Sequence, residues 1–191
     1  MINKMKDIQL SPHFRLSEFL RSSTATARKI DNTPSLDVVS NLQQLCIHVL
    51  EPLRTYANES SPFKGANKGA GEERLNVAPS RSEGRAEPCS TEEKRGSVAV
   101  VISSGYRSKA LNTAVGGAKS SQHMTGEACD IRIPDEATGK KWFTWMMDNL
   151  KFHQLIWEKS TPTSTRHWIH VAYKQDGHNA QHVIQNLVKN P

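Results

Sequence analysis

The amino-acid sequence predicts an α+β fold, in which N-terminal helices pack against a small antiparallel sheet. Apolar residues in the first third of the chain recur at steps of three and four, which is the period of a helix. The second half instead holds short β-branched and aromatic runs joined by short connections. Because helices come first and strands follow, the order favours an antiparallel sheet over parallel βαβ units.

The chain has 191 residues, which is the length of one domain, and 36% of them are hydrophobic. We therefore expect a single domain over residues 1–191. Residues 1–20 contain no sustained apolar stretch with a cleavage site, so no secretory signal is expected. No apolar run approaches the ~20 residues that a membrane-spanning helix needs. The three cysteines are widely spaced and form neither a disulfide framework nor a CxxC zinc motif.

Two helical segments are predicted in the first 58 residues. A short amphipathic segment follows Ser11-Pro12, and its apolar residues are Phe14, Leu16, Phe19 and Leu20. A longer helix begins at Thr33-Pro34, because proline is favoured in the first turn of a helix. Its apolar residues, at helical spacing, are Leu36, Val39, Leu42, Leu45, Val49 and Leu53. We expect Pro52 to kink or end this helix.

The composition changes sharply at residues 59–96. This stretch holds seven acidic and seven basic residues, five glycines and three prolines, and Phe63 is its only aromatic residue. Such a segment buries too little apolar surface to offset the entropy of ordering it, so we expect a flexible insert. A tolerated surface insertion is favoured over an insert that binds a cell wall or a protein partner.

After the insert the pattern changes to short strands and helices. The β-branched run at residues 98–102 predicts a buried strand. The other expected elements are a short helix at 107–114, a strand at 128–133, a helix at 136–150, strands at 155–157 and 168–173, and a final helix at 178–189.

The first group of candidate functional residues lies in the run from Ser121 to Asp130. His123 and Asp130 are seven residues apart, and Gly126 permits a close turn between them. Their side chains can therefore converge on one point, and imidazole and carboxylate are both ordinary zinc ligands. The spacing alone leaves open a histidine and an aspartate that merely border a turn.

The second group lies in the run from His167 to Val171. In a strand, side chains alternate between faces, so His170 shares a face with Trp168. A histidine in an otherwise apolar strand needs a partner, which is either a metal or a backbone carbonyl. Together, His123, Asp130 and His170 would supply three ligands and leave a fourth position open, which is typical of a catalytic zinc site.

Several of these residues form motifs of a known family. The run Ser121-x-His123-x-x-Gly126-x-Ala128-x-Asp130 resembles the SxHxxGxAxD signature of the zinc D-Ala-D-Ala carboxypeptidases, a family that includes phage endolysins. Ser104-Gly105-Tyr106-Arg107 and Trp168-Ile169-His170-Val171 also resemble elements of that family. The segment Phe14–Thr26 with Asn32-Thr33-Pro34 resembles its endolysin-like branch, which is found in phages, prophages and gut bacteria. The resemblance covers roughly residues 11–58 and 97–173 and implies a Hedgehog/D-Ala-D-Ala peptidase-like fold.

The resemblance also implies roles for individual residues. His123, Asp130 and His170 resemble the three zinc ligands. Arg107 resembles the arginine that steadies the substrate's carboxylate or polarised carbonyl, a task suited to the permanently charged, forked guanidinium. Its alternative is a salt bridge that anchors a loop. Ser121 either donates a hydrogen bond to the substrate or caps the loop.

The general base is the least determined role. Several family members have an acidic residue three positions before the last ligand, but His167 occupies that position here. Glu158, at the end of the run Leu155-Ile156-Trp157, is therefore the first candidate for the base, with His167 as an accessory or alternative proton carrier. An ordinary solvated glutamate is the alternative for Glu158.

The resemblance implies a zinc metallopeptidase that hydrolyses peptidoglycan peptides, either as a carboxypeptidase or as an endopeptidase of the endolysin type. The alternative is a non-catalytic module with the same fold, which binds the cell wall or forms part of a phage. The net charge of +6 suits an anionic partner such as DNA, an anionic lipid or a bacterial wall polymer, and does not choose among them.

The remaining expectations concern partners and location. Lysines and arginines are scattered, so no nucleic-acid partner is expected, and neither is a membrane partner. We expect a monomer made in the cytoplasm that reaches the bacterial wall by phage-type release.

Overall fold

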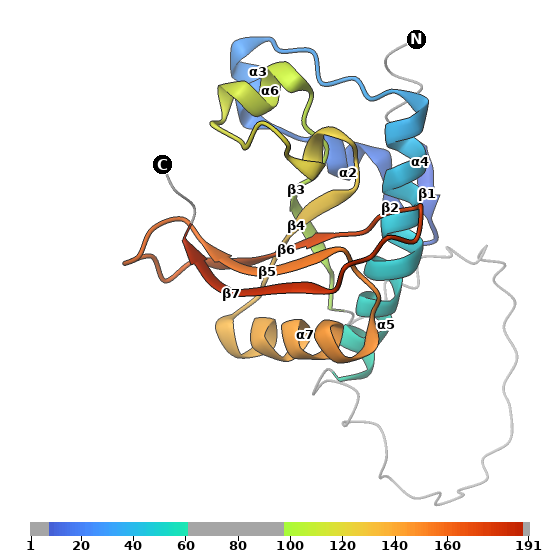
Figure 1. Ribbon diagram of the computed structural model, residues 1–191, viewed down its shortest axis with the longest axis vertical. Coiled ribbons are helices and arrows are strands. Elements are labelled where there is room, and N and C mark those ends of the chain that lie inside the picture. Colours follow the sequence, from blue (N-terminus) through green and yellow to red (C-terminus); the bar gives the residue numbers. More distant parts are fainter. Residues whose placement is uncertain (1–7, 61–97, 189–191) are drawn as a thin grey trace, which may run out of the picture.

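The computed structural model describes residues 8–60 and 98–188 (Figure 1). Its central feature is a five-stranded sheet with the strand order β3-β4-β6-β5-β7. The strands are β3 (Val101–Ser104), β4 (Ala128–Arg132), β5 (Gln154–Lys159), β6 (His167–Ala172) and β7 (His182–Val188). The first four strands in this order pair antiparallel, whereas β7 pairs in parallel with β5. The predicted α+β class is thus confirmed.

The N-terminal part forms a small hairpin followed by short helices. These elements are β1 (Gln9–Ser11), β2 (Phe14–Arg15), α2 (Leu16–Leu20) and α3 (Ser23–Arg28). Two helices of this part begin at serine caps: the Ser22 hydroxyl accepts the backbone N–H of Ala25 in α3, and the Ser35 hydroxyl accepts that of Val38 in α4 (Leu36–Leu45). The two caps therefore fix where these helices begin.

The predicted long helix consists of three helical segments in direct succession. They are α4 (Leu36–Leu45), the π-helical turn η1 (Cys46–Leu50) and α5 (Glu51–Glu59). Pro52 does not end the helix, because it lies in the first turn of α5, directly after the π-helical turn. A π turn alters the backbone hydrogen-bond pattern, so the missing N–H of Pro52 is tolerated there.

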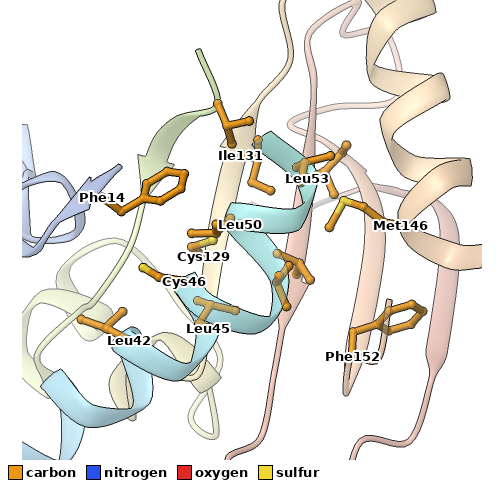
Figure 2. Close-up of a cluster of buried hydrophobic side chains, with 14 of the residues drawn as sticks. Phe14, Leu42, Leu45, Cys46, Leu50, Leu53, Cys129, Ile131, Met146 and Phe152 are labelled. Carbon is orange, nitrogen blue, oxygen red and sulfur yellow. The ribbon is translucent and has the colours of Figure 1, made fainter. Parts of the chain in front are cut away.

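The hydrophobic core lies between this helix and one face of the sheet (Figure 2). Leu45, Cys46 and Leu50 are fully buried on the helix, and they face Cys129 and Ile131 of β4. Since strand residues alternate between faces, the residues next to Cys129 and Ile131 on β4 point to the opposite face. The packing of the core therefore decides which residues of β4 are left for a site.

Three shorter elements complete the described chain: α6 (Lys109–Ala114), the 3-10 turn η3 (Gln122–Met124) and α7 (Glu136–Asn149). The predictions of a short helix at 107–114 and a longer one at 136–150 are confirmed to within two residues. The Asp135 carboxylate caps α7 by accepting the N–H of Thr138 at 2.9 Å. Figure 1 shows α7 on the side of the sheet opposite α2, α3 and α6.

The prediction of a final helix at 178–189 is wrong, because strand β7 occupies most of this range. Gln181 has a positive φ of 51°, which a helix does not permit, and its backbone N–H donates to the Phe152 carbonyl. The segment then pairs with β5, which would otherwise be an edge strand with unpaired backbone groups. The long-range pairing therefore prevails over the local helical pattern.

The predicted insert falls almost entirely outside the described residues. Glu59 belongs to α5, so the helix extends to the first position assigned to the insert. Residues 61–97 lie outside the described part of the chain, and the predicted flexibility of the segment remains a prediction. The strand expected at 98–102 is found slightly later, at Val101–Ser104.

The core packing predicts opposite outcomes for two leucines of the same helical region. Leu50 is 0% exposed, whereas Leu36 is 77% exposed. Leu50→Ala should lower the free energy of unfolding by ~2–5 kcal/mol, because it leaves a cavity in the core. Leu36→Ala should change it by less than ~0.5 kcal/mol. Urea unfolding followed by circular dichroism measures both, and equal effects would contradict the described core.

Candidate metal centre

Three side chains from two strands and one turn meet on the face of the sheet opposite the core. Asp130 on β4 and His170 on β6 are direct cross-strand partners, so their side chains lie on the same face. His123 reaches the same point from η3, the turn before β4. All three residues are buried and could together hold a metal ion.

The distances between the three donor atoms suit tetrahedral coordination. His123 Nε2 lies 3.3 Å from both His170 Nδ1 and Asp130 Oδ1, and the last two atoms are 2.9 Å apart. Zinc–nitrogen and zinc–oxygen bonds of ~2.0–2.1 Å in a tetrahedron give ligand–ligand separations of ~3.3 Å. The donor set and its spacing therefore fit a zinc-like divalent cation with one coordination position left for another ligand.

The orientation of His123 is set by a backbone carbonyl. Its Nδ1 lies 2.7 Å from the Gly105 carbonyl oxygen, which can only accept, so Nδ1 carries the proton and donates it. This leaves the Nε2 lone pair directed toward Asp130 and His170, the arrangement typical of metal-binding histidines. Gly105 itself is confined by the N-terminal region, because a Cβ atom there would lie 2.5 Å from the Cα of Phe19.

A second glycine shapes the turn between His123 and Asp130. Gly126 has a φ of +74°, which glycine adopts without strain. A Cβ atom at Gly126 would also lie 2.7 Å from the Val38 carbonyl oxygen on α4. The predicted close turn is therefore confirmed, and its tight contact with α4 connects the candidate metal centre to the long helix.

The protonation states of His123 and Asp130 suit metal binding. Burial lowers the pKa of His123, which favours the neutral imidazole, although Asp130 opposes this shift. Burial alone would raise the pKa of Asp130, but charge and hydrogen bonds from His123 and His170 hold it well below its ordinary value. A neutral histidine and an ionised aspartate are the forms that coordinate a metal.

The triad lies in a cleft of about 1030 Å³, which is large enough for a peptide segment. Arg107, Ser121 and Glu158 line the same cleft, so the structure brings these three candidates together with the triad. Arg107 is only 9% exposed, and its Nε has no hydrogen-bond partner among the described residues. Burial lowers the pKa of Arg107, while Asp130 and Glu158 favour its charged form.

Glu158 and His167 occupy opposite faces of the sheet. Glu158 is paired with Trp168 across β5 and β6, and Trp168 Nε1 donates a 2.6 Å hydrogen bond to Glu158 Oε2. His167 points away from the cleft and stacks on Trp157, with ring centroids 5.2 Å apart. The structure therefore brings Glu158 to the cleft of the triad and does not bring His167 there.

Two functional contacts were not predicted from the sequence. The contact between the Gly105 carbonyl and His123 cannot be predicted from the type of residue at position 105, because every residue has a backbone carbonyl. The sequence indicates the hydrogen bond from Trp168 to Glu158 only weakly, through the prediction that Trp168 lies on the same strand face as His170. Recognising it would have required the register between β5 and β6.

Comparison with known protein families gives one match. Residues 89–172 match the family model described as Peptidase M15. The matched range contains the triad together with Arg107, Ser121 and Glu158. This match supports the M15 metallopeptidase family for this part of the chain, and with it a metal-dependent hydrolase of peptide bonds. No curated protein matched the chain.

Among the described residues, no helix has the length and apolar character that crossing a bilayer requires.

The triad predicts one divalent cation per chain. His123→Ala should weaken zinc binding by more than ~100-fold, because it removes a ligand from a three-ligand site. His178→Ala is the matched control, since His178 is exposed and lies outside the triad. Competition against a chromophoric chelator measures both affinities. Unchanged zinc affinity in His123→Ala would place the metal elsewhere.

Alanine substitutions at two glycines with positive φ distinguish the effect of backbone strain from the effect of close packing. Gly126 (φ +74°) faces the Val38 carbonyl, whereas a Cβ atom at Gly177 (φ +80°) would meet nothing within 4 Å. Gly177→Ala should cost ~1–2 kcal/mol of stability from strain alone. Gly126→Ala should cost at least ~1 kcal/mol more and also weaken zinc binding, because α4 or the turn must move.

Thermal unfolding and zinc titration of the two variants provide the comparison. Equal losses of stability, with zinc affinity intact in both, would show that the contact between Gly126 and α4 does not support the centre.

Proposed function

We propose that the protein is a zinc-dependent peptidase that hydrolyses peptide bonds of bacterial peptidoglycan. The observation that carries the proposal is the convergence of His123, Asp130 and His170, at tetrahedral spacing, in a cleft that also holds Glu158 and Arg107. The match to the M15 peptidases supports the reaction type. The net charge of +6 favours approach to an anionic wall polymer.

Each residue of the cleft has a defined task in this proposal. When bound, zinc would supply Lewis-acid polarisation of the scissile carbonyl and lower the pKa of the attacking water. Glu158 takes the proton from that water and later returns it to the leaving amine. Arg107 stabilises the negative charge that develops on the carbonyl oxygen or holds a substrate carboxylate. Ser121 contributes a hydrogen bond to the substrate at the entrance to the turn.

The positions of the two candidate bases on the sheet support Glu158 over His167. Glu158 lines the cleft, whereas His167 stacks on Trp157 on the other face. Since a general base must come within hydrogen-bond reach of the proton that it removes, the proposal assigns this task to Glu158 and none to His167.

Digestion of purified peptidoglycan, followed by mass spectrometry of the fragments, tests the proposed function. The zinc-loaded protein should release products with new amino and carboxyl ends, and a chelator should abolish their formation. The position of the new ends distinguishes a carboxypeptidase from an endopeptidase. Binding of peptidoglycan and zinc without any new ends would instead identify a non-catalytic wall-binding or phage structural module.

The assignment of the base makes a sharp prediction. Glu158→Gln keeps the shape of the side chain but cannot accept the proton, so turnover should fall by ~10²–10⁴-fold. Zinc should stay bound, because Glu158 is not one of the three ligands. His167→Ala is the control from the other face of the sheet and should lose less activity. Near-normal turnover in Glu158→Gln, with an inactive but zinc-loaded His167→Ala, would reverse the two roles.

A further inference from the structure

Trp168 and Glu158 form a hydrogen-bonded pair beside the candidate metal centre. They are directly opposite each other on β6 and β5, and both are half-buried. The indole Nε1 of Trp168 donates to Glu158 Oε2 over 2.6 Å. A hydrogen bond to an ionised carboxylate is charge-assisted, and such bonds are stronger than bonds between neutral groups.

This bond restrains the Glu158 carboxylate, which otherwise has, among the described residues, only the charge of Arg107 in the same cleft to attract it. Within residues 8–60 and 98–188, the structure gives the Glu158 carboxylate no other hydrogen bond and no ion pair. A glutamate side chain has several rotatable bonds, and solvent-facing rotamers would carry its carboxylate away from the cleft. Only Oε2 is bound to Trp168, so Oε1 remains available to accept a proton.

The sheet register places this pair next to the triad. Asp130, His170 and Ile156 form one cross-strand row, and Arg132, Trp168 and Glu158 form the next row on the same face. Glu158 is therefore a diagonal neighbour of His170, at a separation of ~7–8 Å along the sheet. A long side chain can bridge this separation when it is held along the surface of the sheet.

We propose that Trp168 is a positioning residue, whose indole N–H holds the Glu158 carboxylate toward the centre formed by His123, Asp130 and His170. This inference rests on the proposed function, because it takes Glu158 as the base. Trp168 acts through Glu158 alone and needs no contact with the substrate or the metal. Its effect should therefore appear in the rate of the chemical step and disappear when Glu158 can no longer act.

Nuclear magnetic resonance tests the hydrogen bond without any turnover. The chain has four tryptophans, and Trp168→Phe identifies the indole N–H signal of Trp168 by its disappearance. In Glu158→Gln, that signal should shift upfield, because a neutral amide oxygen is a weaker acceptor than a carboxylate. The other indole signals should stay in place. A Trp168 signal that does not move would overturn the inference.

Kinetics with a peptidoglycan peptide test the positioning role. Trp168→Phe should reduce kcat by about 10- to 100-fold while KM and bound zinc stay nearly unchanged, because one charge-assisted hydrogen bond is lost. Trp145→Phe is the matched control, since Trp145 stacks on Tyr56 away from the cleft. If Trp168→Phe folds poorly, Trp168→3-benzothienylalanine removes only the N–H donor and keeps the size of the ring.

A double-mutant cycle separates the possible outcomes. In the Glu158→Gln background, Trp168→Phe should cause no further loss of kcat, because the two residues act as one unit. An equal further loss in that background would show that Trp168 acts independently of Glu158 and would refute the inference. Full activity of Glu158→Gln would instead refute the proposed base, even with the hydrogen bond established by resonance.

Discussion

The antiparallel pairing of β4 with β6 is the constraint on which the candidate site depends. Its register places Asp130 opposite His170, so two of the three side chains of the candidate metal centre are fixed by backbone hydrogen bonds. A slip of one residue would turn Asp130 toward the core and Cys129 toward the cleft. The burial of Cys129 and Ile131 against the long helix therefore maintains the site as well as the core.

The position of His123, the third side chain of the candidate metal centre, depends on the N-terminal helices. His123 lies in a turn whose two supporting glycines contact residues far away in the sequence. Gly105 fits against Phe19 of α2, and Gly126 fits against Val38 of α4. Such close backbone packing leaves no room for a Cβ atom, which gives a physical reason for a glycine at each of these positions. Contacts with α2 and α4 thus position the turn so that the His123 side chain reaches Asp130.

Much of this arrangement could be predicted from residue patterns. The period of the apolar residues located the long helix, and the alternation around His170 correctly predicted that it shares a face with Trp168. The run from Ser121 to Asp130 led to the grouping of His123 with Asp130. These features are local, because each depends on the spacing of residues within one element or one turn.

The features that escaped prediction depend on contacts between distant segments. The final strand β7 forms because it pairs with the free edge of β5. The local sequence of residues 178–189 does not show that such an edge is available. The continuation of the helix through Pro52 depends on the π-helical turn before it. The different surroundings of Glu158 and His167 follow from the register of β5 with β6, which the sequence alone does not specify. Glu158 lines the cleft and His167 lies outside it, so the structure favours Glu158 for the proposed role of base.

We propose that the register of the sheet and the turn of His123 form a tetrahedral zinc site with one exchangeable position. X-ray absorption spectroscopy at the zinc edge, on the zinc-loaded full-length protein, tests it most directly. We expect a four-coordinate ion with only nitrogen and oxygen neighbours at ~2.0–2.1 Å and an imidazole signature from two histidines. A sulfur neighbour at ~2.3 Å, or a shell without the signature of two imidazoles, would contradict it.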